Sequence, residues 1–141
     1  MKKPKRDPCD CGSGRSYDGC CGRYHGGEPA PTAEALMRSR YSAYCRGLRD
    51  YLRATWHPRT LAAQALGDTD DAPVKWIGLS ILATRGGGPD DDAGEVEFIA
   101  RCKIGGRAQR LHEISRFTRI EGRWVYVDGE RGANDSSRNG H

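Results

Sequence analysis

Four of the six cysteines lie close together near the N-terminus, in the stretch CDCGSGRSYDGCC. Cys9 and Cys11 form one closely spaced pair. A tetrahedral zinc site needs four soft or borderline ligands, usually offered by two short loops with two ligands each. The spacing therefore predicts a zinc site, in which the second pair of ligands is either Cys20 with Cys21 or Cys20 with His25.

Three other chemistries fit this stretch less well. A disulfide between the neighbours Cys20 and Cys21 would be strained, and no apolar segment typical of a secretion signal follows the basic start MKKPKRDP. A thioredoxin-like redox site needs a C-x-x-C motif beside a βαβ pattern. The GSGR segment has neither the preceding strand nor the following Lys-Ser/Thr of a phosphate-binding loop. A segment without a core of its own is instead well suited to ordering by a metal ion.

Four thiolates would complete the coordination of zinc, so we expect a structural ion rather than a catalytic one. Residues 1–25 contain six Lys or Arg and three Asp, and the formal charge of −2 on a four-thiolate zinc site leaves this segment at about +1. This argues against a strong non-specific nucleic-acid clamp. The basic arm can still contact phosphates through Lys2, Lys3, Lys5 and Arg6.

The composition predicts one domain of ordinary size with a small appendage. The chain has 141 residues, of which 36% are hydrophobic and 30% charged, and its net charge of +4 is spread along the sequence. Residues 77–83 form the clearest apolar run, which is far shorter than the roughly 20 residues of a membrane span. We therefore expect no membrane segment and a cytoplasmic location, where thiols stay reduced.

Changes in composition predict five segments. Residues 1–8 read as a disordered basic arm, residues 9–25 as the zinc module, and residues 26–31 as a linker stiffened by Pro29 and Pro31. Residues 32–129 would form the main domain, and residues 130–141 a disordered tail.

The first half of the main domain has helical periodicity. Thr32 is a plausible N-cap, apolar residues then recur at spacings of three and four, and Gly47 marks the end of this helix or a kink in it. A short second helix carries Tyr51 and Trp56 and stops at Pro58, and a third is expected before Gly67.

The second half alternates as strands do. Strands are predicted over residues 74–85, 95–104, 107–120 and 123–129, with tight turns at Gly105-Gly106 and at the dipeptide EG. In the first of these strands, alternation puts Ile77 with Leu79 and Ile81 on one face and Trp76 on the other. Helices followed by a meander of antiparallel strands predict an α+β fold, in which a curved sheet packed on helices leaves a cone-shaped cavity.

Two residues could carry acid–base chemistry in such a cavity. His57 lies in TWHP and could act in the cavity, or it could simply hold a helix end by hydrogen bonds. Glu113 could be a general base if burial raised its pKa, or it could pair with an arginine such as Arg38 or Arg40. The full set of candidate cavity residues is Arg38, Tyr41, Trp56, His57, Trp76, Glu113, Ser115 and Phe117.

The stretch CDCGSGRSYDGCCG resembles the SEC-C zinc motif, known from the C-terminal tail of the preprotein translocase motor ATPase. The stretch APTAEALMRSRYSAYCRGLRDYLRATWHP, with HEISRF and RWVYVDG, resembles the YchJ family of uncharacterised bacterial proteins, also called UPF0225. The resemblance covers roughly residues 9–130 and implies an N-terminal zinc module followed by an NTF2-like domain. It also implies that the zinc ligands are Cys9, Cys11, Cys20 and Cys21.

Two features depart from the pattern of this family. The final stretch RGANDSSRNGH has no cysteine, whereas many members carry a second SEC-C motif there. Ile114 replaces an arginine in the segment HEISRF, which removes one positive charge.

Three functions fit the sequence. The first is a non-enzymatic adaptor, in which the zinc module contacts a protein or ribosome-associated partner and the NTF2-like domain serves as scaffold. The second is an enzyme or small-molecule binder that uses the cavity with His57 and Glu113. The third is nucleic-acid binding through the basic arm. The chain is expected to be a monomer or a homodimer.

Overall fold

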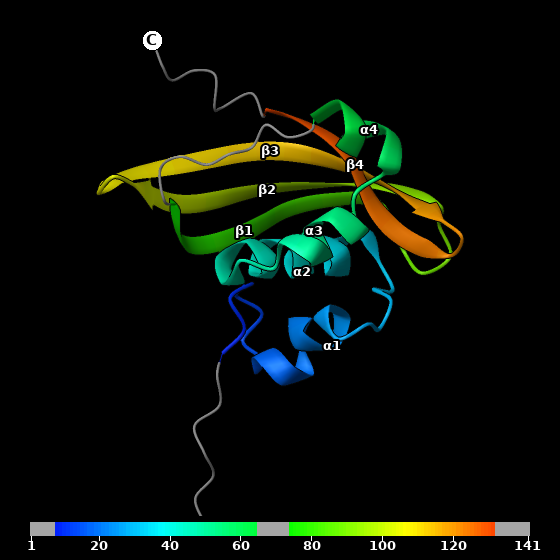
Figure 1. Cartoon of the computed structure of the whole chain (residues 1–141), viewed down its shortest axis with the longest axis horizontal. Helices are drawn as coiled ribbons and strands as arrows, with labels where there is room; N and C mark the ends of the chain where they lie inside the picture. The colour runs from blue at the N-terminus through cyan, green and yellow to red at the C-terminus, as the bar shows by residue number, and fades with distance from the viewer. Residues whose placement is uncertain (1–7, 65–73, 132–141) are drawn as a thin grey trace, which may run out of the picture.

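A computed structural model describes residues 8–64 and 74–131. They form three layers, in which the helices of residues 33–54 lie between a sheet on one side and the cysteine segment on the other (Figure 1). The predicted α+β fold is confirmed. The predicted basic arm lies outside the described residues apart from Pro8, as do residues 132–141 and whatever follows Gln64 in the third predicted helix.

The sheet is an antiparallel meander of four strands in sequence order. Its strands are β1 (Val74–Gly86), β2 (Ala93–Ile104), β3 (Arg107–Ile120) and β4 (Arg123–Arg131). Gly105 and Gly106 join β2 to β3 with φ angles of 58° and 82°, which a two-residue type I′ hairpin turn requires. The last strand runs two residues into the segment that was predicted to be a disordered tail.

The register of β1 differs from the alternation that was predicted. Trp76 and Gly78 pair with consecutive residues of β2, which leaves Ile77 as an extra residue in β1. Such a β-bulge reverses the faces of the residues that follow it. Trp76 therefore packs against the core together with Leu79 and Ile81, whereas Ile77 is 49% exposed. The prediction that Ile77 shares a face with Leu79 and Ile81, and that Trp76 lies on the other face, was wrong.

Helix α2 (Ala33–Arg46) begins and ends as predicted. The Thr32 hydroxyl accepts a hydrogen bond from the backbone N–H of Ala35, and Gly47 ends the helix in the left-handed conformation. Helices α3 (Arg49–Ala54) and α4 (Pro58–Gln64) follow. Among the described residues, no helix is long and apolar enough to cross a membrane.

The main core lies between α2 and the inner face of the sheet. Helix α2 contacts β1, β2 and β4, and most of the buried side chains come from this helix and from the inner face of the strands, with Tyr24 and Ala30 added from the preceding segment. The largest of them are Leu36, Met37, Tyr41, Val96, Phe98, Phe117 and Trp124.

Two connecting segments lie along β4. Residues 55–57 pair with this strand, because the N–H of His57 donates to the carbonyl of Tyr126 and the N–H of Tyr126 to that of Thr55, both at 2.8 Å. In residues 26–31, which were expected to be a linker, Ala30 is buried and the Pro31 carbonyl accepts a hydrogen bond from the indole of Trp124. This segment is therefore packed against the domain.

Candidate metal centre

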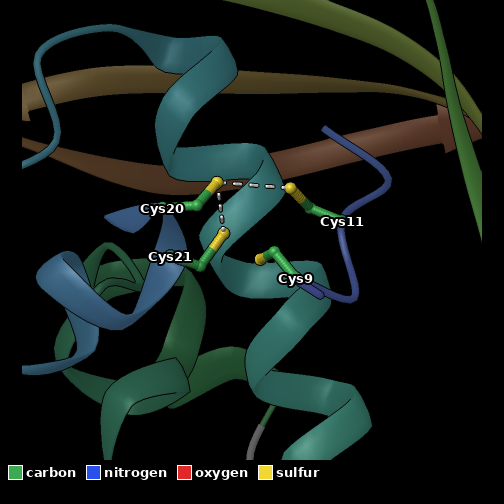
Figure 2. Close-up of side chains that lie close together, drawn as sticks. All are labelled: Cys9, Cys11, Cys20 and Cys21. Carbon is green, nitrogen blue, oxygen red and sulfur yellow. Dashed lines mark hydrogen bonds between the residues drawn. The ribbon is translucent and has the colours of Figure 1, made fainter. Parts of the chain in front are cut away.

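The four N-terminal cysteines converge from two short segments (Figure 2). Cys9 and Cys11 lie in a loop. Cys20 follows the 3-10 helix η1 (Tyr17–Gly19), and Cys21 begins α1 (Cys21–His25). All four sulfurs lie within 4.8 Å of one another, with 3.7 Å between those of Cys11 and Cys20 and 4.0 Å between those of Cys20 and Cys21. Tetrahedral zinc, with Zn–S bonds of about 2.3 Å, separates its sulfurs by about 3.8 Å. The cluster thus has dimensions close to those of a four-thiolate metal site.

Glycines shape the loop that carries the first pair. The N–H of Cys9 donates to the carbonyl of Arg15 at 2.9 Å, and the N–H of Gly12 donates to the carbonyl of Cys9 at 3.2 Å. Gly12 and Gly14 have φ angles of 79° and 89°, a conformation that glycine adopts without steric cost. The glycines of GSGR therefore serve the tight turn that directs the first two sulfurs toward the second pair.

A third glycine fits the second segment against an aromatic ring. A Cβ atom on Gly22 would lie 2.8 Å from the carbonyl oxygen of Tyr17 and 2.9 Å from its ring. Tyr17 packs against the cysteine cluster, as does Leu79 of β1. The close approach of Gly22 lets Tyr17 cover the cluster, whereas Tyr24 belongs to the main core.

The donor set suits a soft metal ion. All four cysteines are buried, with exposed fractions between 0% and 7%. As free thiols they share their protons unevenly: the hydrogen bond between Cys21 and Cys11 lowers the pKa of Cys11 and raises that of Cys21, and burial raises the pKa of Cys9. A divalent cation would replace these protons and offset two of the four negative charges of the thiolates. The four cysteines could therefore hold a metal ion.

His25 is turned away from the cysteines. Its Nε2 lies 2.8 Å from the carbonyl oxygen of Ser39, so Nε2 donates that bond and Nδ1 accepts from the hydroxyl of Tyr17. The ring also packs edge-on against Tyr51, and burial lowers the pKa of His25. Since both ring nitrogens are engaged elsewhere, the geometry assembles Cys20 with Cys21 rather than Cys20 with His25.

One face of α2 holds the cysteine segment. The carboxylate of Asp10 accepts hydrogen bonds of 2.8 Å from the hydroxyl of Ser42 and from Nε of Arg46, and Nη1 of Arg38 donates to the carbonyl of Cys11 at 2.9 Å. The three helix residues are four apart, so they share one face. Arg38, a candidate cavity residue in the sequence, thus contacts the cysteine loop instead.

A hollow of about 530 Å³ opens beside this segment. Two of the predicted cavity residues, Tyr41 and Trp76, line it, and their rings lie 5.8 Å apart between centroids. The rest of its lining is Asp10, Cys45, Lys75 and Ile77.

Trp56 and His57 lie elsewhere, against β4. The rings of Trp56 and Tyr126 are 5.6 Å apart, and Nδ1 of His57 accepts a hydrogen bond from the N–H of Arg59 in the first turn of α4. His57 therefore holds a helix end, which was the structural alternative to a role in catalysis.

The other three candidates lie on the inner face of β3. Phe117 is 2% exposed and belongs to the main core, while the hydroxyl of Ser115 donates to Glu113 at 3.0 Å. Neither Glu113 nor His57 lines the hollow. The residues that were predicted to line a single cavity therefore lie in separate parts of the fold.

Arg40 is a feature that the sequence did not reveal as buried. Its guanidinium donates to the carbonyls of Leu52 and Thr55 and to the Thr55 hydroxyl, and it lies over the rings of Trp56 and Tyr126. Burial lowers the pKa of Arg40. It joins α2 to the segment that follows α3, and the sequence signal for this role is that it follows Leu36 by four residues and so lies on the core-facing side of α2.

Comparison with known proteins agrees with this architecture. Residues 32–129 match a family model described as the YchJ middle NTF2-like domain. A UPF0225 protein from Chromobacterium violaceum is 56% identical over 130 residues, which cover 91% of this chain and 96% of that protein. A UPF0225 protein from Streptomyces coelicolor is 52% identical over 124 residues, which cover 87% and 94%.

Two solved structures share the fold. The solution structure of a SEC-C motif containing protein from Rhodopseudomonas palustris is 36% identical, with a TM-score of 0.73 over 88% of this chain and 98% of that one. The crystal structure of a SEC-C motif containing protein from Psychrobacter arcticus is 26% identical, with a TM-score of 0.66 over 91% and 83%. The resemblance stated from the sequence is confirmed: this chain belongs to the YchJ family, UPF0225.

Proposed function

We propose that this protein is a zinc-binding adaptor. Residues 9–25, ordered by the metal, present a recognition surface to a protein or ribosome-associated partner, and the NTF2-like domain is the scaffold. The observation that carries the proposal is the closed cluster of four buried sulfurs within 4.8 Å of one another, fixed to the outer side of α2.

The ligand chemistry favours zinc in a structural role. Four thiolates at tetrahedral spacing complete the coordination of Zn²⁺ and leave no position for substrate or water. The ion would supply order to a segment too small to have its own core. Arg38 and Arg46 lie beside this segment, where their positive charges offset part of the formal −2 of a four-thiolate zinc site. A reducing cytoplasm would keep the thiols available to the metal.

The recognition surface is the solvent side of the cysteine segment. Residues 12–15 and 18–19 are exposed, whereas the cysteines and the polar groups that meet α2 are covered. Arg15 projects from the exposed loop between the two cysteine pairs. A partner bound there would contact a loop whose shape depends on the metal.

Substitution of two pairs of cysteines tests the proposal. Cys20→Ala/Cys21→Ala should lose the bound zinc, measured by elemental analysis, and should lose partners in pull-down and ribosome co-sedimentation. Cys45→Ala/Cys102→Ala removes two thiols outside the cluster and should keep both. Retention of every partner by the cluster variant would refute the adaptor role, while absence of zinc from the wild type would refute the metal assignment.

The hollow supports a second candidate, binding of a small amphipathic ligand. Tyr41 and Trp76 offer aromatic walls, and Asp10 and Cys45 add polar groups to the lining of the same hollow. This form of the ligand-binding alternative places the site at these residues rather than at His57 and Glu113. A metabolite screen by NMR should shift the Trp76 indole resonance and the Cys45 amide resonance, and the Cys45 shift should vanish in Trp76→Phe. Shifts confined to other residues would contradict it.

A further inference from the structure

The outer face of the sheet, which points away from α2, is strongly cationic at one end. Directly paired residues of antiparallel strands point to the same face. Because Ala100 and Cys102 of β2 are buried on the inner face, Arg101 and Lys103 lie on the outer one. Their partners place two more cations there, which gives a basic end formed by Lys75, Arg101, Lys103 and Arg110, all exposed, next to the β2–β3 turn (Figure 1).

The pairing puts like charges directly opposite each other. Lys75 pairs with Lys103 across β1 and β2, and Arg101 pairs with Arg110 across β2 and β3. Like charges in such positions destabilise a sheet. Residues 74–80 and 99–112 contain no Asp or Glu, and none of the four cations forms an ion pair within the described part of the chain. Among the described residues, no carboxylate offsets this repulsion.

The opposite end of the same face is neutralised. Arg85 pairs with Glu95 and Glu97 at 3.5 and 3.2 Å, and Arg116 pairs with Asp128 at 2.8 Å. At one end of this face the arginines pair with carboxylates. At the basic end the described cations have no carboxylate partner, so their charges are available to an anionic ligand.

We infer that the basic end binds the phosphate backbone of nucleic acid without sequence specificity. Cations two residues apart on one strand are about 6.8 Å apart, and those on neighbouring strands about 4.8 Å. Such a grid can contact several phosphates at once, and guanidinium groups match phosphate oxygens in bidentate geometry. Gly78 and Ala108, which pair with Arg101 and Lys103, are the small residues of this grid. At these two positions the grid offers no large apolar anchor of the kind that dominates protein partners, and the exposed Ile77 precedes Gly78 in β1.

This inference is independent of the proposed adaptor role. The basic end belongs to the sheet, and the sheet and the cysteine segment lie on opposite sides of α2 (Figure 1). Binding at the basic end therefore does not require a metal ion at the cysteines. It also differs from the hypothesis of binding through the basic arm, because the four cations belong to strands. Deletion of residues 1–7 separates these two sources of affinity.

Fluorescence anisotropy with a labelled single-stranded RNA of mixed sequence tests the inference. Four phosphate contacts on a single strand give a salt slope of about −2.8, so the affinity should fall about 50-fold between 50 and 200 mM salt. Lys75→Gln/Arg101→Gln/Lys103→Gln/Arg110→Gln should lose most of the binding at 50 mM salt. Deletion of residues 1–7 should leave most of it, and an RNA of unrelated sequence should bind equally.

The matched control is Arg85→Gln/Arg116→Gln, which removes cations from the neutralised end of the same face. It should change RNA affinity less than Arg101→Gln/Arg110→Gln, which removes the same number of charges from the basic end. Thermal unfolding should show that Arg101→Gln/Arg110→Gln is at least as stable as the wild type, so its loss of binding would not come from unfolding. Equal effects of the two double variants, no RNA binding at 50 mM salt, or binding only to anionic vesicles or an acidic polypeptide would overturn the inference.

Discussion

The carboxylate of Asp10, which lies between the first two cluster cysteines, accepts a 2.8 Å hydrogen bond from Nε of Arg46 in the last turn of α2. The same oxygen accepts a second bond from Ser42. The cysteine segment is therefore packed on α2 by polar contacts of Asp10, and its four cysteine side chains contact one another. Binding of a metal ion at the cluster would therefore be coupled to the position of α2 through these bonds.

The first prediction concerns this contact. Asp10→Asn removes the charge from a pair whose side chains are only about a quarter exposed, and it should lower the free energy of unfolding by about 1 kcal/mol. Urea denaturation measures the change. Asp18→Asn alters an exposed carboxylate of the same segment and should have little effect. Metal content should stay unchanged in both variants, and equal destabilisation by the two would contradict the role of Asp10.

Metal removal gives the second prediction. A strong chelator under reducing conditions should broaden or shift the NMR signals of residues 9–25, because this segment lacks a core of its own. The sheet should stay folded, since its core forms between α2 and the strands, but the melting temperature should fall as the contacts of Asp10 and Arg38 loosen. Loss of the whole sheet spectrum on chelation, or an unchanged spectrum for residues 9–25, would contradict this arrangement.

The third prediction follows from His25. Burial lowers its pKa below the ordinary value of 6.5, so its NMR titration midpoint should lie below 6.5. In the unfolded chain this histidine takes up a proton near pH 6.5, whereas in the folded chain it stays neutral to lower pH. Its contribution to stability is therefore present above pH 6.5 and is lost as the pH falls below that value. His25→Gln should weaken the acid sensitivity of unfolding, and a midpoint above 6.5 would contradict the burial.

Local features were predictable from the sequence because they are determined by a few neighbouring residues. The Gly105-Gly106 turn needs positive φ angles, and the Thr32 cap needs one hydroxyl near one free N–H. The four cluster cysteines were identified by ligand type, spacing and resemblance. The β-bulge at Ile77 was missed because the apolar residues around it fit either alternation equally well.

Positions that depend on contacts between distant parts of the chain were harder to predict from the sequence. Helical spacing puts Arg40 on the side of Leu36, but it does not show that Arg40 is buried or that Arg38 meets the cysteine loop, since both depend on what packs on each face of α2. The division of the predicted cavity has the same origin. His57 follows α3 onto β4, whereas Glu113 stays on β3, and one chain order permits both arrangements.

The fourth prediction concerns two glycines where β1 turns into β2. A Cβ atom on Gly94 would overlap Cα of Gly87, whose carbonyl accepts the N–H of Ala33 at the start of α2. Gly94→Ala should therefore separate two backbones that position this helix, and it should lower the free energy of unfolding by roughly 1–3 kcal/mol. Gly78→Ala is the matched control, because its Cβ would meet nothing within 4 Å, and it should change stability by less than about 0.5 kcal/mol. Urea denaturation of both variants measures the contrast. If the two substitutions cost the same, the close approach of Gly94 to Gly87 does not constrain the fold, and the start of α2 must be positioned by its other contacts.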